Sequence, residues 1–254
     1  MSAPLLRVEK LAKRFGGIVA TDDLSLEVGT GDLHAIIGPN GAGKTTLIAQ
    51  LSGQLRPDTG HIRFDGRDIT ALPMYKRNRR GLARSFQITS LFLDLSVLDN
   101  VALAVQAHAG HSFRFWGNAR RDDALRGPAR AALEQVGLID RADRPAAALS
   151  HGEHRLLELA MALAGKPRML LLDEPMAGLG PEESARMVEM LRALKAQFTI
   201  LLVEHDMEAV FALADKITVL VYGRVIASGA PDDIRANQQV REAYLGDAEE
   251  GVVS

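Results

Sequence analysis

The sequence predicts an α/β fold with a parallel core, an antiparallel β subdomain and an inserted helical lobe. Apolar strand-like runs alternate with helix-favouring segments through the second half of the chain, as in parallel α/β cores. Near the N-terminus, residues 24–28 alternate apolar and polar side chains, which indicates a half-buried strand. From about residue 88 to residue 149 the pattern is mostly helical. We therefore expect one domain over residues 1–254, with the core and β subdomain at about 1–87 and 150–246 and the lobe at about 88–149.

The individual elements follow from local patterns along the chain. Strands are indicated by apolar or alternating runs, and helices by helical periodicity bounded by turn residues and stop signals. We expect strands at 5–15, 24–28, 33–37, 61–64, 82–86, 169–172 and 198–203, and helices at 43–52, 74–80, 153–164 and 181–195. Helical pattern also covers about 97–138, where the polar and aromatic stretch 111–117 interrupts it.

Composition limits the classes of function. The chain has 254 residues, 47% of them hydrophobic, which is ample for a core. Its net charge of −2 gives no bulk attraction to nucleic acid or anionic lipid, and the absence of cysteine excludes disulfides and cysteine metal sites. No apolar run approaches the ~18 residues that a membrane helix needs, and the N-terminus lacks a signal-peptide pattern. We expect a soluble, cytoplasmic protein that reaches a membrane only through a partner.

The most informative stretch is residues 38–45, which read GPNGAGKT and match the phosphate-binding pattern G-x-x-x-x-G-K-[ST] in full. An apolar strand precedes it and a helix follows, so free backbone N–H groups and the positive end of the helix dipole face an anion. The competing interpretation is a glycine-rich turn before an ordinary helix. Eight matching positions in this context favour a nucleotide site.

Each residue type in this loop has a chemical reason. Gly41 and Gly43 allow the backbone to wrap a phosphate without Cβ clashes. Lys44 supplies a positive charge for the β- and γ-phosphates, and Thr45 supplies a hydroxyl for Mg²⁺. The predicted nucleotide-binding residues of this segment are Gly38, Asn40, Gly41, Ala42, Gly43, Lys44, Thr45 and Thr46.

Polar side chains follow three other predicted strands. Asp173 closes the strand at 169–172, where it can hold Mg²⁺ directly or through water, and the adjacent Glu174 can act as general base toward the attacking water. His205 follows another apolar strand and can donate to the γ-phosphate, while Gln87 can reach Mg²⁺ and water. Parallel strands deliver their carboxyl ends to one edge. Alone, these residues also fit a polar turn, a helix-capping histidine and a surface glutamine.

A second candidate anion site precedes the helix expected from Glu153. Ser150, with His151 and Gly152, provides N-cap chemistry and free backbone N–H groups at a helix N-terminus. The sequence Ser150-x-x-Glu153 also fits a capping box, and both interpretations can hold together. The predicted helical lobe separates this site from the phosphate loop. If one chain cannot bring the two anion sites to the same phosphate, two chains that dimerise head to tail can.

Together these motifs resemble the ATP-binding subunits of ABC transporters, over about residues 5–246. The resemblance implies a P-loop ATPase fold with a RecA-like core. Residues 38–45 are similar to Walker A, 149–155 to the family signature, 169–174 to Walker B with its catalytic glutamate, 178–180 to the D-loop, and Gln87 and His205 to the Q-loop and H-loop. Phe15 lies where the family places an aromatic that stacks on adenine, and the choice of ATP over GTP rests on the resemblance.

The resemblance also implies a mechanism and partners. Two subunits, as a homodimer or a heterodimer with a second ABC ATPase, clamp two Mg²⁺–ATP molecules. Each ATP then lies between Walker A of one subunit and the signature residues Ser150, Gly152 and Glu153 of the other. Closure and hydrolysis drive membrane permease subunits at the inner face of the cell membrane, which the helical lobe touches. A solute-binding protein is an indirect partner, and no nucleic acid is expected.

A finer resemblance is to the larger ATPase of branched-chain amino acid importers, carried by residues 83–87, 97–100, 203–207 and 243–246. Urea importers and the lipopolysaccharide-export ATPase are similar relatives. A second hypothesis is a soluble ABC-type ATPase that acts on nucleic acid or ribosomes, but such proteins usually have tandem ATPase domains or long coiled coils, and neither is visible here. A third is a module that binds ATP without turnover, against which Glu174 and His205 argue. The basic helix with Lys76, Arg77, Arg79 and Arg80 looks like a nucleic-acid patch, but a solvated helix facing a transporter is favoured because aromatic interleaving and basic net charge are lacking.

The chain departs from the family pattern at three positions. His151 and Glu153 replace the commonest glycine and glutamine of the signature, and we expect His151 to need an unusual backbone angle. Gly180 stands where the D-loop usually has Asp or Asn, which puts the D-loop contact across a dimer in doubt.

Overall fold

The computed structural model describes residues 3–85, 91–109 and 122–243. A six-stranded sheet forms the centre, with strand order β10-β9-β3-β8-β7-β6. All neighbouring strands in it are parallel except the β9–β10 hairpin. Its strands are β3 (Leu33–Ile37), β6 (Leu82–Arg84), β7 (Met169–Asp173), β8 (Thr199–Val203), β9 (Lys216–Val221) and β10 (Arg224–Gly229).

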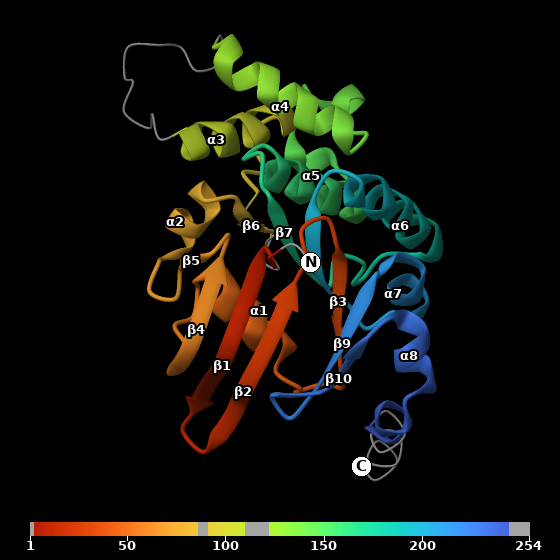
Figure 1. Ribbon diagram of the computed structural model, residues 1–254. Helices are drawn as coiled ribbons and strands as arrows, with labels where there is room; N and C mark the ends of the chain where they lie inside the picture. Colours follow the sequence, from red (N-terminus) through yellow and green to blue (C-terminus); the bar gives the residue numbers. More distant parts are fainter. Residues whose placement is uncertain (1–2, 86–90, 110–121, 244–254) are drawn as a thin grey trace.

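A second, antiparallel sheet has the order β2-β1-β4-β5 and lies beside the first (Figure 1). Its strands are β1 (Leu6–Phe15), β2 (Ile18–Val28), β4 (Thr59–Phe64) and β5 (Arg67–Asp68). The helix α1 (Lys44–Ser52) packs between the two sheets, because one apolar cluster joins its Leu47, Ile48 and Leu51 to buried residues of both. The predicted α/β class with an antiparallel β part is confirmed.

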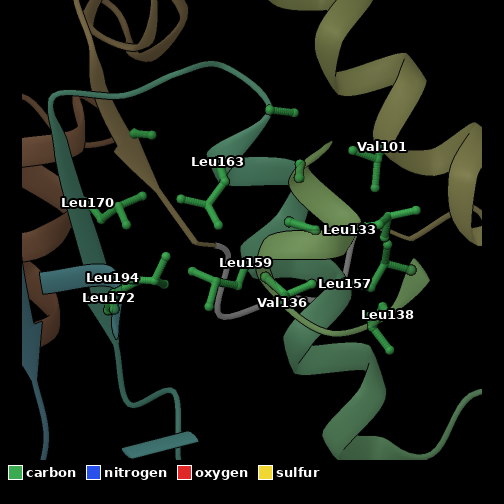
Figure 2. Close-up of a cluster of buried hydrophobic side chains, with 14 of the residues drawn as sticks. Val101, Leu133, Val136, Leu138, Leu157, Leu159, Leu163, Leu170, Leu172 and Leu194 are labelled. Carbon is green, nitrogen blue, oxygen red and sulfur yellow. The ribbon is translucent and has the colours of Figure 1, made fainter. Parts of the chain in front are cut away.

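The other face of the central sheet is covered by α5 (His151–Leu163), α6 (Pro181–Lys195), α7 (Met207–Leu213) and α8 (Pro231–Ala236) (Figure 1). The helices α3 (Val97–Ala109) and α4 (Asp123–Gln135) pack on α5, whereas α2 (Met74–Arg79) lies against α1 and the edge strand β6. Figure 2 shows one apolar core in which Leu159 and Leu163 of α5 lie between the sheet residues Leu170 and Leu172 and the helical residues Val101 and Leu133. This cluster ties α3 and α4, which lie in the lobe predicted at 88–149, to the central sheet through α5.

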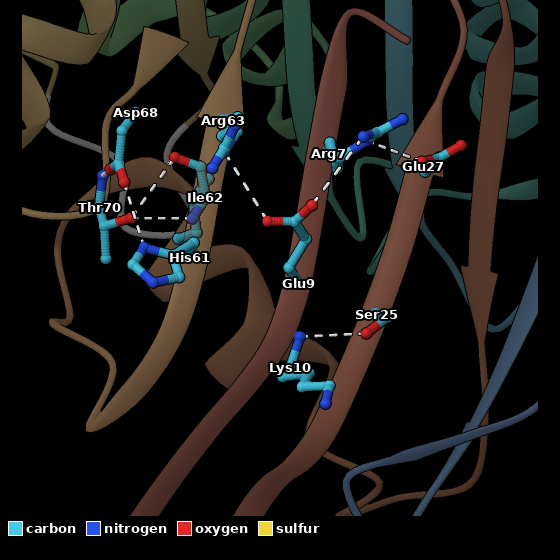
Figure 3. A network of polar contacts seen from close by, with 10 residues as sticks. All are labelled: Arg7, Glu9, Lys10, Ser25, Glu27, His61, Ile62, Arg63, Asp68 and Thr70. Atoms are coloured by element: carbon cyan, nitrogen blue, oxygen red, sulfur yellow. Dashed lines mark hydrogen bonds and ion pairs between the residues drawn. The ribbon is translucent and has the colours of Figure 1, made fainter. Parts of the chain in front are cut away.

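The outer face of the antiparallel sheet is polar. Figure 3 shows the cross-strand ion pairs of Arg7 with Glu27 at 2.8 Å and of Arg63 with Glu9 at 3.7 Å. These side chains are roughly half exposed, so water screens the pairs and each contributes only about 0–1 kcal/mol. The alternation of these polar residues with buried ones such as Leu6 and Val8 follows from the two-residue period of a strand.

Most predicted elements lie within two residues of the observed ones, but two expectations need correction. The strand predicted at 24–28 begins earlier, at Ile18, because β2 pairs with β1 along its length down to the Phe15–Ile18 pair. Arg77 is not a solvated residue of a basic helix: its side chain is fully buried. Its guanidinium donates to the carbonyls of Gln50 and Leu51, which lie in the last turn of α1.

The predicted interruption at 111–117 and the Q-loop residue Gln87 lie outside the described residues. Among the helices that the structure describes, each is too short or too polar to cross a membrane.

Candidate functional site

Three neighbouring strands bring the predicted site residues to one edge of the central sheet. In the register of β3, β8 and β7, Val203 lies opposite both Ile36 and Asp173. The segments that follow these strands therefore leave the sheet side by side. They are the phosphate loop after β3, the loop with Glu174 after β7 and the loop with His205 after β8.

The phosphate loop has the backbone that its glycines were predicted to allow. Gly38, Gly41 and Gly43 all have positive φ, of 154°, 77° and 99°. A Cβ on Gly38 or Gly43 would overlap a carbonyl oxygen, that of Leu220 or that of Ala20 respectively. Glycine is therefore required at both positions by conformation and by space. The contact with Ala20 also brings β2 of the antiparallel sheet against the loop.

Lys44 is buried at the start of α1, and its Nζ donates to the carbonyls of Gly38 at 2.6 Å and Pro39 at 2.9 Å. The ammonium thus lies over the loop whose N–H groups are to hold the phosphates. Thr45 and Asn40 are exposed, Thr46 is half-buried and Ala42 is buried. A strand end, a wrapped glycine loop, a lysine and a helix N-terminus together form a phosphate cradle.

Asp173 is buried, and Arg84 at the end of β6 donates to its Oδ2 at 3.0 Å. Oδ1 has no hydrogen-bond partner within the described residues. Burial raises the pKa of Asp173, the nearby charge of Glu174 raises it further, and the positive charges of Arg84 and Lys44 oppose both. An ionised Asp173 is therefore dependent on neighbouring cations, and its unpartnered oxygen is suited to a metal ion.

Glu174 and His205 lie on the two loops next to Asp173. Glu174 has a positive φ of 50°, unusual for a residue with a side chain, and its N–H donates to Val203 O at 2.9 Å. Its side chain is half-buried, and the side chain of His205 is 65% exposed. Both groups are accessible at the edge where the phosphate loop begins.

Phe15 ends β1 and is 48% exposed, with Lys13 Nζ 5.6 Å from the centre of its ring. An exposed aromatic face in the sheet that touches the phosphate loop is available for stacking on a base.

Ser150 and Glu153 form the predicted capping box at the start of α5. Ser150 Oγ accepts from Glu153 N–H, and Ser150 N–H donates to Glu153 Oε2 at 2.8 Å. The other carboxylate oxygen of Glu153 accepts from Arg141 at 3.1 Å. The Glu153 side chain is therefore engaged by the first turn of α5 and by Arg141, and it makes no hydrogen bond to the phosphate loop of its own chain within the described residues. Gly152 is buried, and a Cβ there would meet Glu183 Oε1 at 2.5 Å.

The backbone expectation for His151 is wrong. His151 is the first residue of α5 and has ordinary helical geometry, because the signature turn is completed before it by the extended Ser150.

Two functional contacts could not be anticipated from single motifs. Arg84 pairs with Asp173, 89 residues further along the chain. Glu204 is fully buried and accepts N–H groups of Met176 and His205. Glu204 had one sequence signal, a charged residue at the end of an otherwise apolar strand.

The fold and this site define a P-loop nucleotide-binding ATPase. The family model for ABC transporters matches residues 21–177, and a model for the branched-chain amino acid ATP-binding cassette transporter matches residues 224–250. The chain belongs to the ABC transporter family and is an ABC-type ATPase.

Curated relatives extend over nearly the whole chain. The high-affinity branched-chain amino acid transport ATP-binding protein BraF of Pseudomonas aeruginosa is 39% identical over 98% of this chain and 100% of its own length. The corresponding LivG of Escherichia coli K12 is 38% identical with the same coverage. The lipopolysaccharide export system ATP-binding protein LptB of Acidithiobacillus ferridurans is 36% identical over 96% of this chain and 97% of its own.

Solved structures agree with the fold and with nucleotide binding. An ATP-binding cassette of an ABC transporter in its ADP conformation is 31% identical, with a TM-score of 0.85, and covers 96% of this chain and 100% of its own. A nucleotide-free cassette, also 31% identical, has a TM-score of 0.84 and covers 95% and 98%. The chain therefore has the fold of the ATP-binding cassettes of ABC transporters.

Proposed function

We propose that this chain hydrolyses ATP to drive an importer of branched-chain or related amino acids. The observation that carries the ATPase assignment is the convergence of a phosphate cradle, Asp173, Glu174 and His205 at one sheet edge. The likeness to BraF and LivG over nearly the full length supports the class of solute.

In this proposal, different residues of the chain bind the nucleotide and catalyse its hydrolysis. The phosphate loop and Lys44 bind and orient the β- and γ-phosphates, and Phe15 stacks on the adenine. Glu174 accepts a proton from the attacking water as it approaches the γ-phosphate, and His205 donates to a γ-phosphate oxygen and keeps that water in line. Gln87, outside the described residues, is assigned to the same water and metal.

The site fits Mg²⁺. Asp173 has a buried oxygen without a hydrogen-bond partner among the described residues, and Thr45 presents a hydroxyl at the start of α1. Hard oxygen ligands of this kind suit Mg²⁺. When bound, the ion neutralises charge on the β- and γ-phosphates. Arg84 must then share Asp173 with the metal, since its guanidinium already occupies Oδ2.

A second subunit completes the site in this proposal. The N-terminus of α5, with Ser150 and Gly152, offers backbone N–H groups to an anion. Within one chain α5 packs on α3, α4 and β6, whereas α1 packs on α2, β2, β6 and β7. A head-to-tail dimer places the α5 N-terminus of one subunit over the phosphate loop of the other.

The permease docks beside the site in this proposal. A largely apolar groove of about 330 Å³ lies between α2, α3 and α5, lined by Tyr75, Leu91, Phe92, Leu103, Ala104 and Met161 among others. Phe92 and Tyr75 are each 58% exposed there. An apolar groove of this size suits an amphipathic helix of a partner. Through it the subunit would be held at the inner membrane.

The second candidate function is that of an ATPase of another ABC transporter, which the 36% identity to LptB supports. Co-purification separates the two: a branched-chain importer subunit is expected to retain a two-component permease whose transport of leucine or valine needs this chain. Retention of lipopolysaccharide-export components instead would overturn the solute assignment.

The ATPase assignment is tested by Glu174→Gln. Loss of the general base is expected to lower turnover by a factor of about 10² or more, while the affinity for a fluorescent ATP analogue stays unchanged. Glu182→Gln, on the exposed face of α6, is the matched control and should keep wild-type turnover. Wild-type hydrolysis by Glu174→Gln would contradict the assignment.

A further inference from the structure

A buried carboxylate connects the two loops that carry the proposed catalytic groups. Glu204 follows β8 directly and has no exposed surface. Its Oε1 accepts from the N–H of Met176 at 2.9 Å, and its Oε2 accepts from the N–H groups of His205 at 2.9 Å and Asp206 at 3.4 Å. Met176 lies two residues after Glu174. One side chain therefore spans from the loop of Glu174 to the loop of His205.

The backbone around Glu204 places this side chain at the junction of three strand ends. Its own N–H points to Ile36 O at 3.5 Å, near the end of β3. The N–H of Glu174 donates to Val203 O, one residue before Glu204. Because β8 lies between β3 and β7 in the sheet, Glu204 is next to all three segments that build the site.

The contacts of Glu204 require a carboxylate. In the described part of the chain, no lysine or arginine nitrogen lies within 4 Å of its carboxylate oxygens, and the basic group within that distance is His205 Nδ1 at 3.6 Å. The buried charge is therefore balanced by backbone N–H donors on both oxygens. A glutamine has one acceptor oxygen and would turn its NH₂ group toward an N–H on one side.

We propose that Glu204 is a positioning residue for ATP hydrolysis, which fixes the loop of Glu174 relative to His205. The inference rests on the proposed roles of those two residues. Glu204 acts through them: within the described residues its hydrogen bonds and its ion pair go to Met176, His205 and Asp206, and not to side chains of the phosphate loop. Its loss is therefore expected to change the rate of the chemical step and to leave nucleotide affinity intact, because small displacements of catalytic groups are costly.

The test compares turnover with nucleotide binding in Glu204→Gln. We expect kcat to fall at least tenfold, with KM for Mg²⁺–ATP and the affinity for a fluorescent ATP analogue within twofold of wild type. Hydrogen exchange should become faster at the Met176 amide or at the His205 and Asp206 amides, since the side that faces the glutamine NH₂ group loses its acceptor. A normal kcat, or a parallel loss of kcat and affinity, would overturn the positioning role.

Asp215→Asn is the matched control. Asp215 also accepts a backbone N–H of a neighbouring strand, that of Leu33 at 2.9 Å, but at the start of β3, the opposite end from the site. This variant should lose thermal stability and keep wild-type kcat. If Glu204→Gln does not fold, Glu204→Asp serves instead: it keeps the charge but is one methylene too short to reach both loops, so the same kcat loss is expected.

Glu174→Gln in the same assay separates this inference from the proposed function. An inactive Glu174→Gln beside a fully active Glu204→Gln would overturn the positioning role alone. An active Glu174→Gln would remove the catalytic assignment on which it rests.

Discussion

Lys44 illustrates how one side chain prepares the phosphate cradle. Its ammonium is held by the carbonyls of Gly38 and Pro39, where bound β- and γ-phosphates would compete for it. A charge-assisted hydrogen bond to phosphate is worth about 1.5–3 kcal/mol.

Lys44→Ala is therefore expected to weaken nucleotide binding about ten- to a hundredfold, since each 1.4 kcal/mol is a factor of ten. Equilibrium titration of a fluorescent ATP analogue measures it. Lys195→Ala is the control, because Lys195 pairs with Asp215 far from the loop and should bind nucleotide normally. Unchanged affinity in Lys44→Ala would remove the phosphate-loop assignment.

At the scale of elements, β3 leads into the phosphate loop and also contains a buried titratable side chain, His34. Burial lowers the pKa of His34 to about 4, and the charge of Lys216 acts in the same direction. His34 Nε2 lies 2.7 Å from Thr218 Oγ1 on β9. The neutral imidazole is therefore the form that the folded strand accepts.

This predicts a pH-dependent stability. His34 stays neutral in the folded chain while the unfolded chain takes up a proton below its ordinary pKa of 6.5. The stabilising contribution of the neutral His34 is therefore fully present above pH 6.5. Below that pH the free energy of unfolding falls, by about 3 kcal/mol at pH 4. Denaturant unfolding of wild type and His34→Gln between pH 7.5 and 5 measures the effect. The variant should be less pH-dependent; equal slopes would contradict the account.

Features that depend on neighbouring residues were predictable from the sequence, whereas features that depend on distant residues were not. Residues 38–45 and the capping box at Ser150 were predictable because their chemistry is local: glycines, a lysine and a cap act within a few residues. The contacts of Arg77 with α1 and of Arg84 with Asp173 were not, since these acceptors lie 26 and 27 residues from Arg77 and 89 residues from Arg84. Arg77 was predicted to be solvated from its charged neighbours, yet the carbonyls at the end of α1 bury it.

At the scale of the whole molecule, the α/β class followed from alternating strands and helices, while the sheet order did not. Placing β8 between β3 and β7 requires knowledge of long-range pairing, and that placement is what makes Glu204 a neighbour of all three site loops. Among the described residues, one apolar cluster joins α1 to both sheets, and another joins α3, α4 and α5 to the opposite face of the central sheet.

The central claim is that one sheet edge forms a nucleotide site completed by a second subunit. Sedimentation of Glu174→Gln with Mg²⁺–ATP tests it most directly, since this variant should bind ATP without consuming it. The account predicts a species of twice the mass of the chain that retains two ATP molecules, and a monomer when Lys44→Ala is added. A Glu174→Gln chain that remains monomeric at saturating ATP would contradict it.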